Sequence, residues 1–273
     1  MSGPAPGGRG GLRLAANVSW MFADLPFLER PAAAARAGFG AVECHYPYDT
    51  PAGDLRAALA EAGVPILGIN TAVQRLGPGD TGAGALPGHE AEAKARFDEA
   101  LDYLRAVGGR AIHVKPGEAD AASPEAHACF VAHLRHCAGR AAPHGVTLLI
   151  EPLNTVDSPG YFLRSNAQAA GIVAEAGAPA LRLMFDLYHM RMDGADVLAE
   201  FARHRAIIGH LQFAGIAGRH EPDAACLSLL ARLKGLGHAD WMAAEYRPSG
   251  ATSADLGWMA RLDALCAAAG PGA

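Results

Sequence analysis

The sequence predicts an α/β protein in which eight strands form one closed (β/α)8 barrel. From residue 12 onward, short apolar runs typical of β-strands alternate with alanine-rich segments of helical spacing. Such alternation indicates parallel strands joined by crossover helices. Eight strand-helix units in a chain of 273 residues also match the usual size of this barrel.

The predicted strands are short and mostly apolar. We place them at residues 12–17, 41–46, 65–70, 111–116, 147–152, 181–187, 207–213 and 241–247. Between them, segments such as 90–107 and 125–142 carry apolar residues at the spacing of an amphipathic helix. Several helices are predicted to end at a glycine shortly before the next strand, as is typical of helix C-termini. These glycines are Gly38, Gly63, Gly108, Gly145 and Gly177.

The chain is predicted to form one catalytic domain, residues 12–268, between flexible tails at 1–11 and 269–273. No linker-like change of composition interrupts the repeated units. The alternative is a doubly wound open sheet, but residues 17–20 read Asn-Val-Ser-Trp where its glycine fingerprint is expected. Segment 76–88 contains five glycines and two prolines. Its length and composition predict either a lid over the site or a surface insertion.

Composition excludes several classes of protein. Hydrophobic residues make up 51% and charged residues 19% of the chain, as in ordinary globular proteins. A net charge of −5 offers no basic surface for nucleic acid, and no apolar run reaches the roughly 18 residues of a membrane span. The N-terminus lacks the apolar core of a secretion signal, and the five cysteines never stand in C-x-x-C spacing. We therefore expect a cytoplasmic protein that acts on a small molecule, with a homo-oligomer left open.

Polar residues stand at the end of nearly every predicted strand. Residues two apart share one face of a strand, so paired polar residues at one strand end can point inward together. The C-terminal strand ends are where barrels of this kind carry their active sites. The set comprises Asn17, Glu43, His45, Asn70, His113, Lys115, Glu151, Asp186, His210, Gln212 and Glu245.

Four oxygen donors follow the last four strands. They are Glu151, Asp186, Gln212 and Glu245. They recur at intervals of about 30 residues, the length of one strand-helix unit, so they can converge on one point. Ligation by oxygen alone suits Mg²⁺ or Mn²⁺ better than zinc. The alternative is that each acid caps a helix or pairs with a nearby arginine or lysine.

Candidate substrate-binding residues surround this predicted metal site. His189 follows Asp186 by three positions and could hydrogen-bond a substrate oxygen. Arg219 lies in a loop after the seventh strand and could bind a carboxylate with two hydrogen bonds. Glu43, His113 and Lys115 complete the set, although the sequence also allows them to form a buried ion-pair network. Trp20 and Phe22 follow the first strand and are candidates for the pocket wall.

At these motifs the chain resembles the hydroxypyruvate isomerase family. The resemblance extends over nearly the whole chain from residue 12 and is most specific in the second half. It rests on Glu151-Pro152-Leu153-Asn154, Gly160-Tyr161-Phe162-Leu163, Phe185-Asp186-Leu187-Tyr188-His189-Met190, Gly209-His210-Leu211-Gln212, Gly218-Arg219-His220-Glu221-Pro222 and Glu245-Tyr246-Arg247-Pro248. The sequence departs from the family pattern at 223–226, where Asp-Ala-Ala-Cys replaces a glycine-rich turn, and at Lys115-Pro116.

The resemblance implies a xylose-isomerase-like TIM barrel with one divalent ion and with Glu151 and Glu245 as the proton-transferring pair. We therefore predict an isomerase that interconverts hydroxypyruvate and tartronate semialdehyde through an enediolate. The alternatives within the same group are a 2-oxo-tetronate isomerase, a ketose 3-epimerase and a dehydratase. A nuclease would require more His and Asp ligands and a basic surface. A non-catalytic sugar-binding barrel is the remaining alternative.

Overall fold

A computed structural model describes residues 8–9, 11–77, 79–252 and 255–268 of the chain. Within these residues, eight parallel strands and one short antiparallel strand form a single sheet. The parallel strands are β2 (Leu12–Asn17), β3 (Ala41–Glu43), β4 (Gly68–Asn70), β5 (Ala111–His113), β6 (Thr147–Ile150), β7 (Leu181–Asp186), β8 (Ile208–Phe213) and β9 (Trp241–Ala244). All eight predicted strands are confirmed, although most are shorter than predicted.

Part of the predicted N-terminal tail is ordered into a strand. Gly8 and Arg9 form β1 (Gly8–Arg9), which pairs antiparallel with the start of β2. The rest of the predicted tails, residues 1–7, 10 and 269–273, lies outside the described residues. No helix of the described part of the chain is long and apolar enough to cross a membrane.

The strands close into the predicted barrel. Along the sheet β2 pairs with β9, and the order then descends from β9 to β4, while β3 pairs with the other edge of β2. The ring closes between β3 and β4 through a bridge between Val42 and Ile66. Two backbone hydrogen bonds reinforce it, from Val42 N to Pro65 O at 2.9 Å and from Leu67 N to Val42 O at 2.7 Å.

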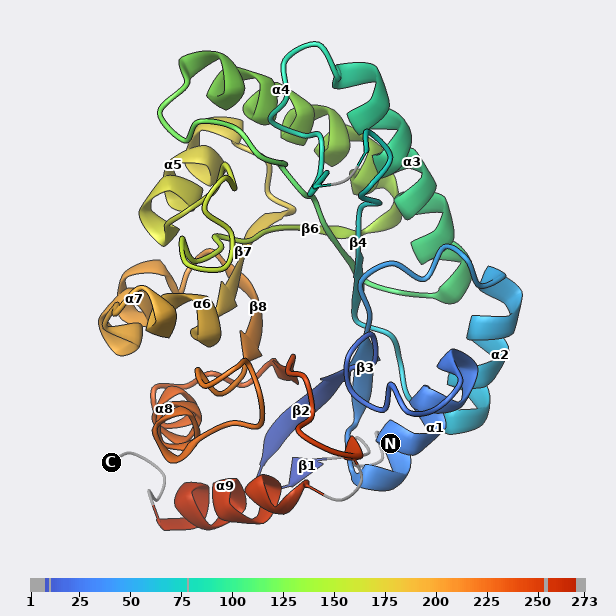
Figure 1. The fold of residues 1–273 in the computed structure, drawn as a ribbon, viewed down its shortest axis with the longest axis vertical. Coiled ribbons are helices and arrows are strands. Elements are labelled where there is room, and N and C mark those ends of the chain that lie inside the picture. Colours follow the sequence, from blue (N-terminus) through green and yellow to red (C-terminus); the bar gives the residue numbers. More distant parts are fainter. Residues whose placement is uncertain (1–7, 10, 78, 253–254, 269–273) are drawn as a thin grey trace.

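Helices surround the barrel as an outer ring (Figure 1). They are η1 (Phe27–Glu29), α1 (Arg30–Ala37), α2 (Ala52–Ala62), α3 (Glu90–Val107), α4 (Pro124–Ala141), η2 (Ala142–His144), α5 (Asn166–Ala176), α6 (Leu187–Met192), α7 (Val197–His204), α8 (Ala224–Gly235) and α9 (Gly257–Ala268). Each of the five predicted C-terminal glycines has a positive φ, between 64° and 99°. Glycine adopts this left-handed conformation without steric penalty, so the predicted helix ends are confirmed.

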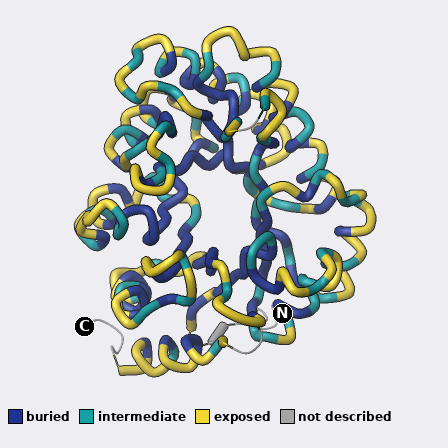
Figure 2. The backbone as a smooth tube through the Cα atoms, in the orientation of Figure 1, coloured by how far each residue is buried: buried dark blue, intermediate teal, exposed yellow. Residues whose placement is uncertain are grey.

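Alternation along the strands decides which side chains enter the barrel. Figure 2 shows the buried residues gathered on the strands and the exposed ones on the outer helices. In β9, Met242 and Ala244 belong to the core between strands and helices, while Trp241 and Ala243 belong to a small cluster inside the barrel. Because successive side chains point to opposite faces, Glu245 continues the inward series. The same rule aims the polar ends of the other strands into the barrel mouth.

Segment 76–88 does not cover the site as a lid. Its second half is docked beside β5, with Ala85 N donating to Pro116 O at 2.7 Å. A side chain at Gly82 would place its Cβ 2.5 Å from Lys115 O, so glycine permits this close approach. Asp80 forms a buried ion pair with Arg96 of α3 at 2.7 Å. None of the segment's described residues lines the active-site cavity, so the structure shows an anchored insertion.

Candidate active site

A cavity of about 620 Å³ opens at the C-terminal ends of the strands. Every strand from β2 to β9 supplies a lining residue, either from its end or from the loop that follows. Of the predicted site residues, the cavity is lined by His113, Lys115, Glu151, His189, Gln212, Arg219 and Glu245. Asp186 is buried beside it and contacts Arg219 and His189. The structure thus brings together all but one of the predicted site residues.

Glu43 is the exception, because it lies beneath the cavity rather than on its wall. It faces a smaller internal cavity of about 150 Å³ in the barrel below. Its carboxylate accepts hydrogen bonds from Asn17 and Gln212 and pairs with His210. The prediction that Glu43 binds substrate is therefore not supported. His45 and Tyr46, two and three residues further along the same chain segment, line the cavity instead.

Glu151 and Asp186 form the centre of a buried acidic cluster. One ligand atom from each, together with one from His189, lies within 4.8 Å of the others. Glu151 Oε1 and Gln212 Oε1 are both buried and have no hydrogen-bond partner. Buried acceptors are almost always satisfied, so these two oxygens indicate a missing positive or hydrogen-donating group.

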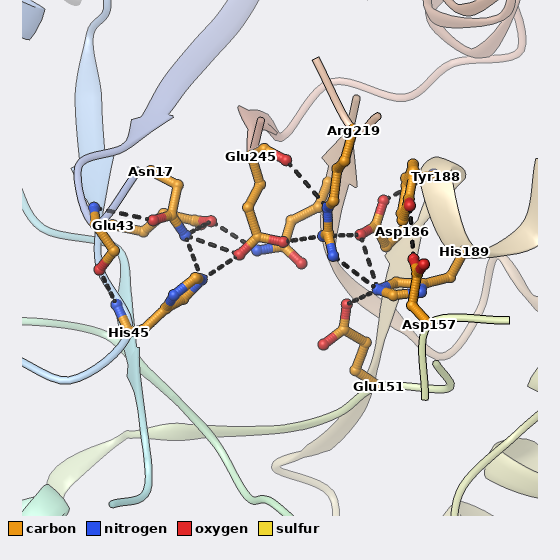
Figure 3. Close-up of polar contacts among 12 residues, drawn as sticks. Asn17, Glu43, His45, Glu151, Asp157, Asp186, Tyr188, His189, Arg219 and Glu245 are labelled. Carbon is orange, nitrogen blue, oxygen red and sulfur yellow. Dashed lines mark hydrogen bonds and ion pairs between the residues drawn. The ribbon is translucent and has the colours of Figure 1, made fainter. Parts of the chain in front are cut away.

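Arg219 lies between the carboxylates of Asp186 and Glu245 (Figure 3). Its Nη2 donates to Asp186 Oδ2 at 2.9 Å and forms an ion pair with Glu245 Oε2. The guanidinium also stacks 4.7 Å from the ring centre of Trp20 and 4.4 Å from that of Tyr188. The predicted wall role of Trp20 is confirmed. Its predicted companion Phe22 is buried away from the cavity, 6.4 Å from Phe39 between ring centres.

The tautomer of His189 is determined by Asn154. The backbone N–H and the side-chain amide of Asn154 both donate to His189 Nδ1, at 3.0 and 2.8 Å. The amide cannot be reversed, since its Oδ1 already accepts from the backbone N–H groups of Val156 and Asp157. Nδ1 is therefore the acceptor and Nε2 carries the hydrogen.

This tautomer makes His189 a hydrogen-bond donor to the cavity rather than a metal ligand. Its Nε2 lies 3.7 Å from Glu151 Oε1 and 3.6 Å from Asp186 Oδ2. Burial and the nearby charge of Arg219 lower the pKa of His189, so the ring stays neutral. Arg219 Nη1 lies 3.2 Å from Nε2. In this tautomer the contact joins two donors, so it is not a hydrogen bond.

His113 and Lys115 line the cavity and also join the buried charge network, so both interpretations of these residues hold. His113 Nδ1 lies 3.5 Å from Glu151 Oε2, and burial keeps the pKa of this imidazole low. Lys115 Nζ lies 5.0 Å from the ring centre of Tyr161. Burial lowers the pKa of Lys115, but Tyr161, Tyr46 and Glu151 outweigh this effect, so the lysine remains charged.

The two predicted proton-transfer residues have pKa values shifted in opposite directions. Burial, together with the negative charges of Glu245 and Asp186, raises the pKa of Glu151 well above its ordinary value. Burial also raises the pKa of Glu245, but Arg219 and His45 outweigh it and lower the value to about 2. Such a separation is typical of an acid and a base that share one site.

The site fits a divalent cation. Burial raises the pKa of Asp186 to about 7 against the opposing effect of Arg219, so the ionised carboxylate is poorly stabilised and a bound cation would stabilise it. The unpaired oxygens of Glu151 and Gln212 are hard donors of the kind that Mg²⁺ and Mn²⁺ prefer. Among the described residues, one group of three potential ligands lies close together, and two of its members, Glu151 and Asp186, are carboxylates that a cation could use.

Several lining residues were not identified as candidates from the sequence. Asn154, Asp157, Ser158, Tyr188 and Arg247 lie in or beside the cavity. Asn154 and Tyr188 stand within the motifs that carry the family resemblance, which was the available signal. Asp157 and Ser158 lie in the loop after β6, where no local pattern indicates the direction of a side chain.

Comparison with known proteins identifies the family. Residues 31–262 match the family model described as a xylose isomerase-like TIM barrel. The chain belongs to this family. A 2-oxo-tetronate isomerase of Cupriavidus necator is 42% identical over 90% of this chain and 97% of its own length. Hydroxypyruvate isomerase of Escherichia coli is 32% identical over 91% of this chain and 98% of its own.

A solved structure of a relative agrees with the architecture of this family member. It is described as an AP endonuclease of family 2 from Brucella melitensis and is 34% identical to this chain. The two superpose with a TM-score of 0.87 over 92% of this chain and 98% of the other. The predicted fold and the predicted resemblance are confirmed, and the chain is an isomerase, as its curated relatives are.

Proposed function

We propose that the protein is a metal-dependent isomerase that moves the carbonyl group of a short 2-oxo hydroxy acid from C2 to C3. Hydroxypyruvate, which would give tartronate semialdehyde, is the smallest such substrate. The observation that carries the proposal is the set of buried carboxylates Glu151, Asp186 and Glu245 near the Arg219 guanidinium, together with the unpaired oxygens of Glu151 and Gln212, two residues that line the same cavity.

Four residues would hold the ion, namely Glu151, Asp186, Gln212 and Glu245. The ion would be Mg²⁺ or Mn²⁺, because every proposed ligand atom is an oxygen. When bound, it would polarise adjacent carbonyl and hydroxyl oxygens and stabilise the negative charge that develops on them. His189 cannot serve as a ligand in its present tautomer, since its hydrogen occupies Nε2.

The proton transfers can be assigned to the two glutamates. Glu245 Oε1 is held by Asn17 at 2.9 Å and by His45 at 2.5 Å, so Oε2, which pairs with Arg219, is the oxygen that can face the substrate once Arg219 binds the substrate carboxylate. With its low pKa, Glu245 is the ionised partner that takes a proton from C3. Glu151, the other glutamate of the pair, delivers a proton to C2. The hydroxyl proton passes from O3 to O2, so the isomerisation gains or loses no atoms.

The remaining cavity residues bind and orient the substrate. Arg219 is the candidate for its carboxylate, because a guanidinium offers two parallel donors to such a group. For this it must exchange part of its contact with Asp186 and Glu245 for the substrate. Nε2 of His189 can donate to one of the two oxygens that change their bonding. Lys115 adds a second positive charge to the cavity wall near Glu151.

A four-carbon 2-oxo-tetronate is the preferred substrate in this proposal. A cavity of about 620 Å³ leaves space beyond a three-carbon acid. Asp157, Ser158 and Arg247 line its outer part and could bind an additional hydroxyl group. The higher identity to the relative named 2-oxo-tetronate isomerase supports the same choice.

The test is an assay in D₂O with metal-free protein and with protein reloaded with Mg²⁺ or Mn²⁺. We expect turnover of 2-oxo-tetronate and of hydroxypyruvate only with metal, and deuterium at C2 of the product. Glu175→Gln, which alters an exposed acid paired with His127, is the matched control and should retain full activity. If metal-loaded protein isomerises neither acid, the proposed function is wrong.

A further inference from the structure

Glu43 makes the closest polar contact to a proposed metal ligand from below the cavity. Gln212 Nε2 donates to Glu43 Oε1 at 2.7 Å, whereas Gln212 Oε1 is buried and has no partner. We propose that Glu43 is a positioning residue that holds the Gln212 amide with its oxygen toward the cation site. This inference rests on the metal dependence proposed above.

The orientation of the Gln212 amide matters because its two ends differ chemically. An amide offers two hydrogens at one end and lone pairs at the other, and only the oxygen end can bind a cation. If the group were reversed, Gln212 Oε1 would lie against Glu43 Oε1, and two acceptors in contact repel. The reversed amide would also direct its hydrogens at the carboxylates of the cation site. A carboxylate beneath Gln212 therefore selects the orientation that metal binding requires.

Glu43 is itself held firmly enough to impose this orientation. Its Oε1 also accepts from Asn17 Nδ2 at 3.1 Å, and its Oε2 pairs with His210 Nε2 at 2.6 Å. The Asn17 amide is oriented in turn, because its Oδ1 accepts from the backbone N–H of Ser19 at 3.1 Å. The left part of Figure 3 shows Asn17, Glu43 and His45 close together, with Asp186 and Glu151 on the right. Groups outside the ligand set of a metal commonly fix its ligands in this way.

The competing explanation is that Glu43 only satisfies buried donors and so stabilises the fold. The two explanations differ when Gln212 is replaced by glutamate. A carboxylate has an oxygen at both ends, so it presents one oxygen to the cation site in either orientation, while its other oxygen lies against Glu43 Oε1 and is repelled by it. A positioning role for Glu43 then becomes unnecessary, whereas a general structural role remains.

The experiment compares Mn²⁺ affinity of the full chain, measured from the signal of free Mn²⁺ in electron paramagnetic resonance. Glu43→Met removes the acceptor at similar volume, and we expect about tenfold weaker binding, the lower end of the usual effect of such groups. Glu43→Gln keeps an oxygen for Gln212 and should stay within about threefold of the natural protein. In a chain that carries Gln212→Glu, adding Glu43→Met should not weaken the affinity, because it removes the repulsion between the two carboxylates.

Controls separate this inference from loss of structure and from failure of the proposed function. Glu200→Met removes an acceptor from the Asn166 amide, remote from the site, and should leave Mn²⁺ affinity unchanged. If Glu43→Met does not fold, Glu43→Asp retracts the carboxylate and permits the same comparison. Equal weakening with and without Gln212→Glu, or no weakening in either, would overturn the positioning role. Absence of Mn²⁺ binding by the natural protein would instead overturn the proposed function, and the inference with it.

Discussion

The two halves of the barrel contribute different chemistry to one cavity. Strands β6 to β9 end in Glu151, Asp186, Gln212 and Glu245, the oxygen donors proposed to hold a cation. Strands β2 to β5 end in amides, imidazoles and a lysine, and the one carboxylate among these strand ends, Glu43, lies beneath the cavity. Similar inward-facing positions therefore carry the reacting groups in one half of the barrel and the groups that orient them in the other half.

The contacts between the halves support this division. Asn17 and His45 from the first half hold one oxygen of Glu245, and Glu43 holds the nitrogen of Gln212. On the opposite side, His113 lies beside Glu151. Replacing a proposed proton-transferring or ligand group should therefore reduce the reaction more than replacing a group that orients or supports it.

The largest effect is expected for Glu245→Gln. Removing the proposed base should lower kcat about 10³-fold, within the usual range for loss of a general base. Because the amide oxygen remains, Mn²⁺ binding should weaken much less than turnover. Steady-state kinetics with 2-oxo-tetronate at saturating metal measure the first effect, and Mn²⁺ titration measures the second. Full isomerase turnover by this variant with metal bound would show that Glu245 is not the base.

A smaller effect, about 10²-fold in kcat/KM, is expected for Arg219→Lys. The variant keeps the positive charge but loses the planar pair of donors and the stacking between Trp20 and Tyr188. The loss should be mainly in KM, as expected for a group that binds the substrate carboxylate. A wild-type KM in this variant would assign the carboxylate to another cation, with Lys115 as the first candidate.

Asn154→Ala should lower kcat about tenfold, because His189 could then adopt either tautomer instead of the Nε2–H form alone. The ¹⁵N chemical shifts of the ring report which nitrogen carries the hydrogen, and we expect a single Nε2–H form in the natural protein. In the variant, a mixture of the two forms should appear. An unchanged ring spectrum in Asn154→Ala would contradict the assignment of this asparagine.

The smallest effect concerns stability and pH. Asp186, with a pKa raised to about 7 in the fold, binds a proton that the unfolded chain releases near pH 4. Between these values the folded state binds more protons, so this group destabilises the metal-free protein as pH rises. A cation replaces the proton, and Mn²⁺ should therefore raise Tm by several degrees more at pH 8 than at pH 6. A metal-dependent increase that is equal at both pH values would contradict this coupling.

Much of the fold could be predicted because the signals are local. Apolar strands and glycine-terminated helices repeat along the chain, and each repeat was recognisable separately. The inward direction of Glu151, Asp186, Gln212 and Glu245 also followed from alternation within single strands. The short strand β1 was not predicted, because Gly8 and Arg9 carry no apolar pattern.

The remaining features depend on contacts between distant parts of the chain. Glu43 contacts Gln212 through the barrel interior although β2 and β9 separate their strands in the sheet, and no spacing along the chain reveals this contact. Phe22 was expected at the cavity wall, but its positive φ of 60° and the hydrogen bond from its N–H to Thr252 accompany its burial in the core. The docking of Asp80 onto Arg96 similarly depended on tertiary contact.

The central claim is that Glu151, Asp186, Gln212 and Glu245 together hold one divalent ion. Its most direct test is equilibrium Mn²⁺ binding to the metal-stripped chain and to Asp186→Asn, with Glu175→Gln as control. The account predicts one bound ion per chain in the natural protein and in the control, and binding at least tenfold weaker in Asp186→Asn. Absence of binding by the natural chain, or equal affinity in Asp186→Asn, would contradict it.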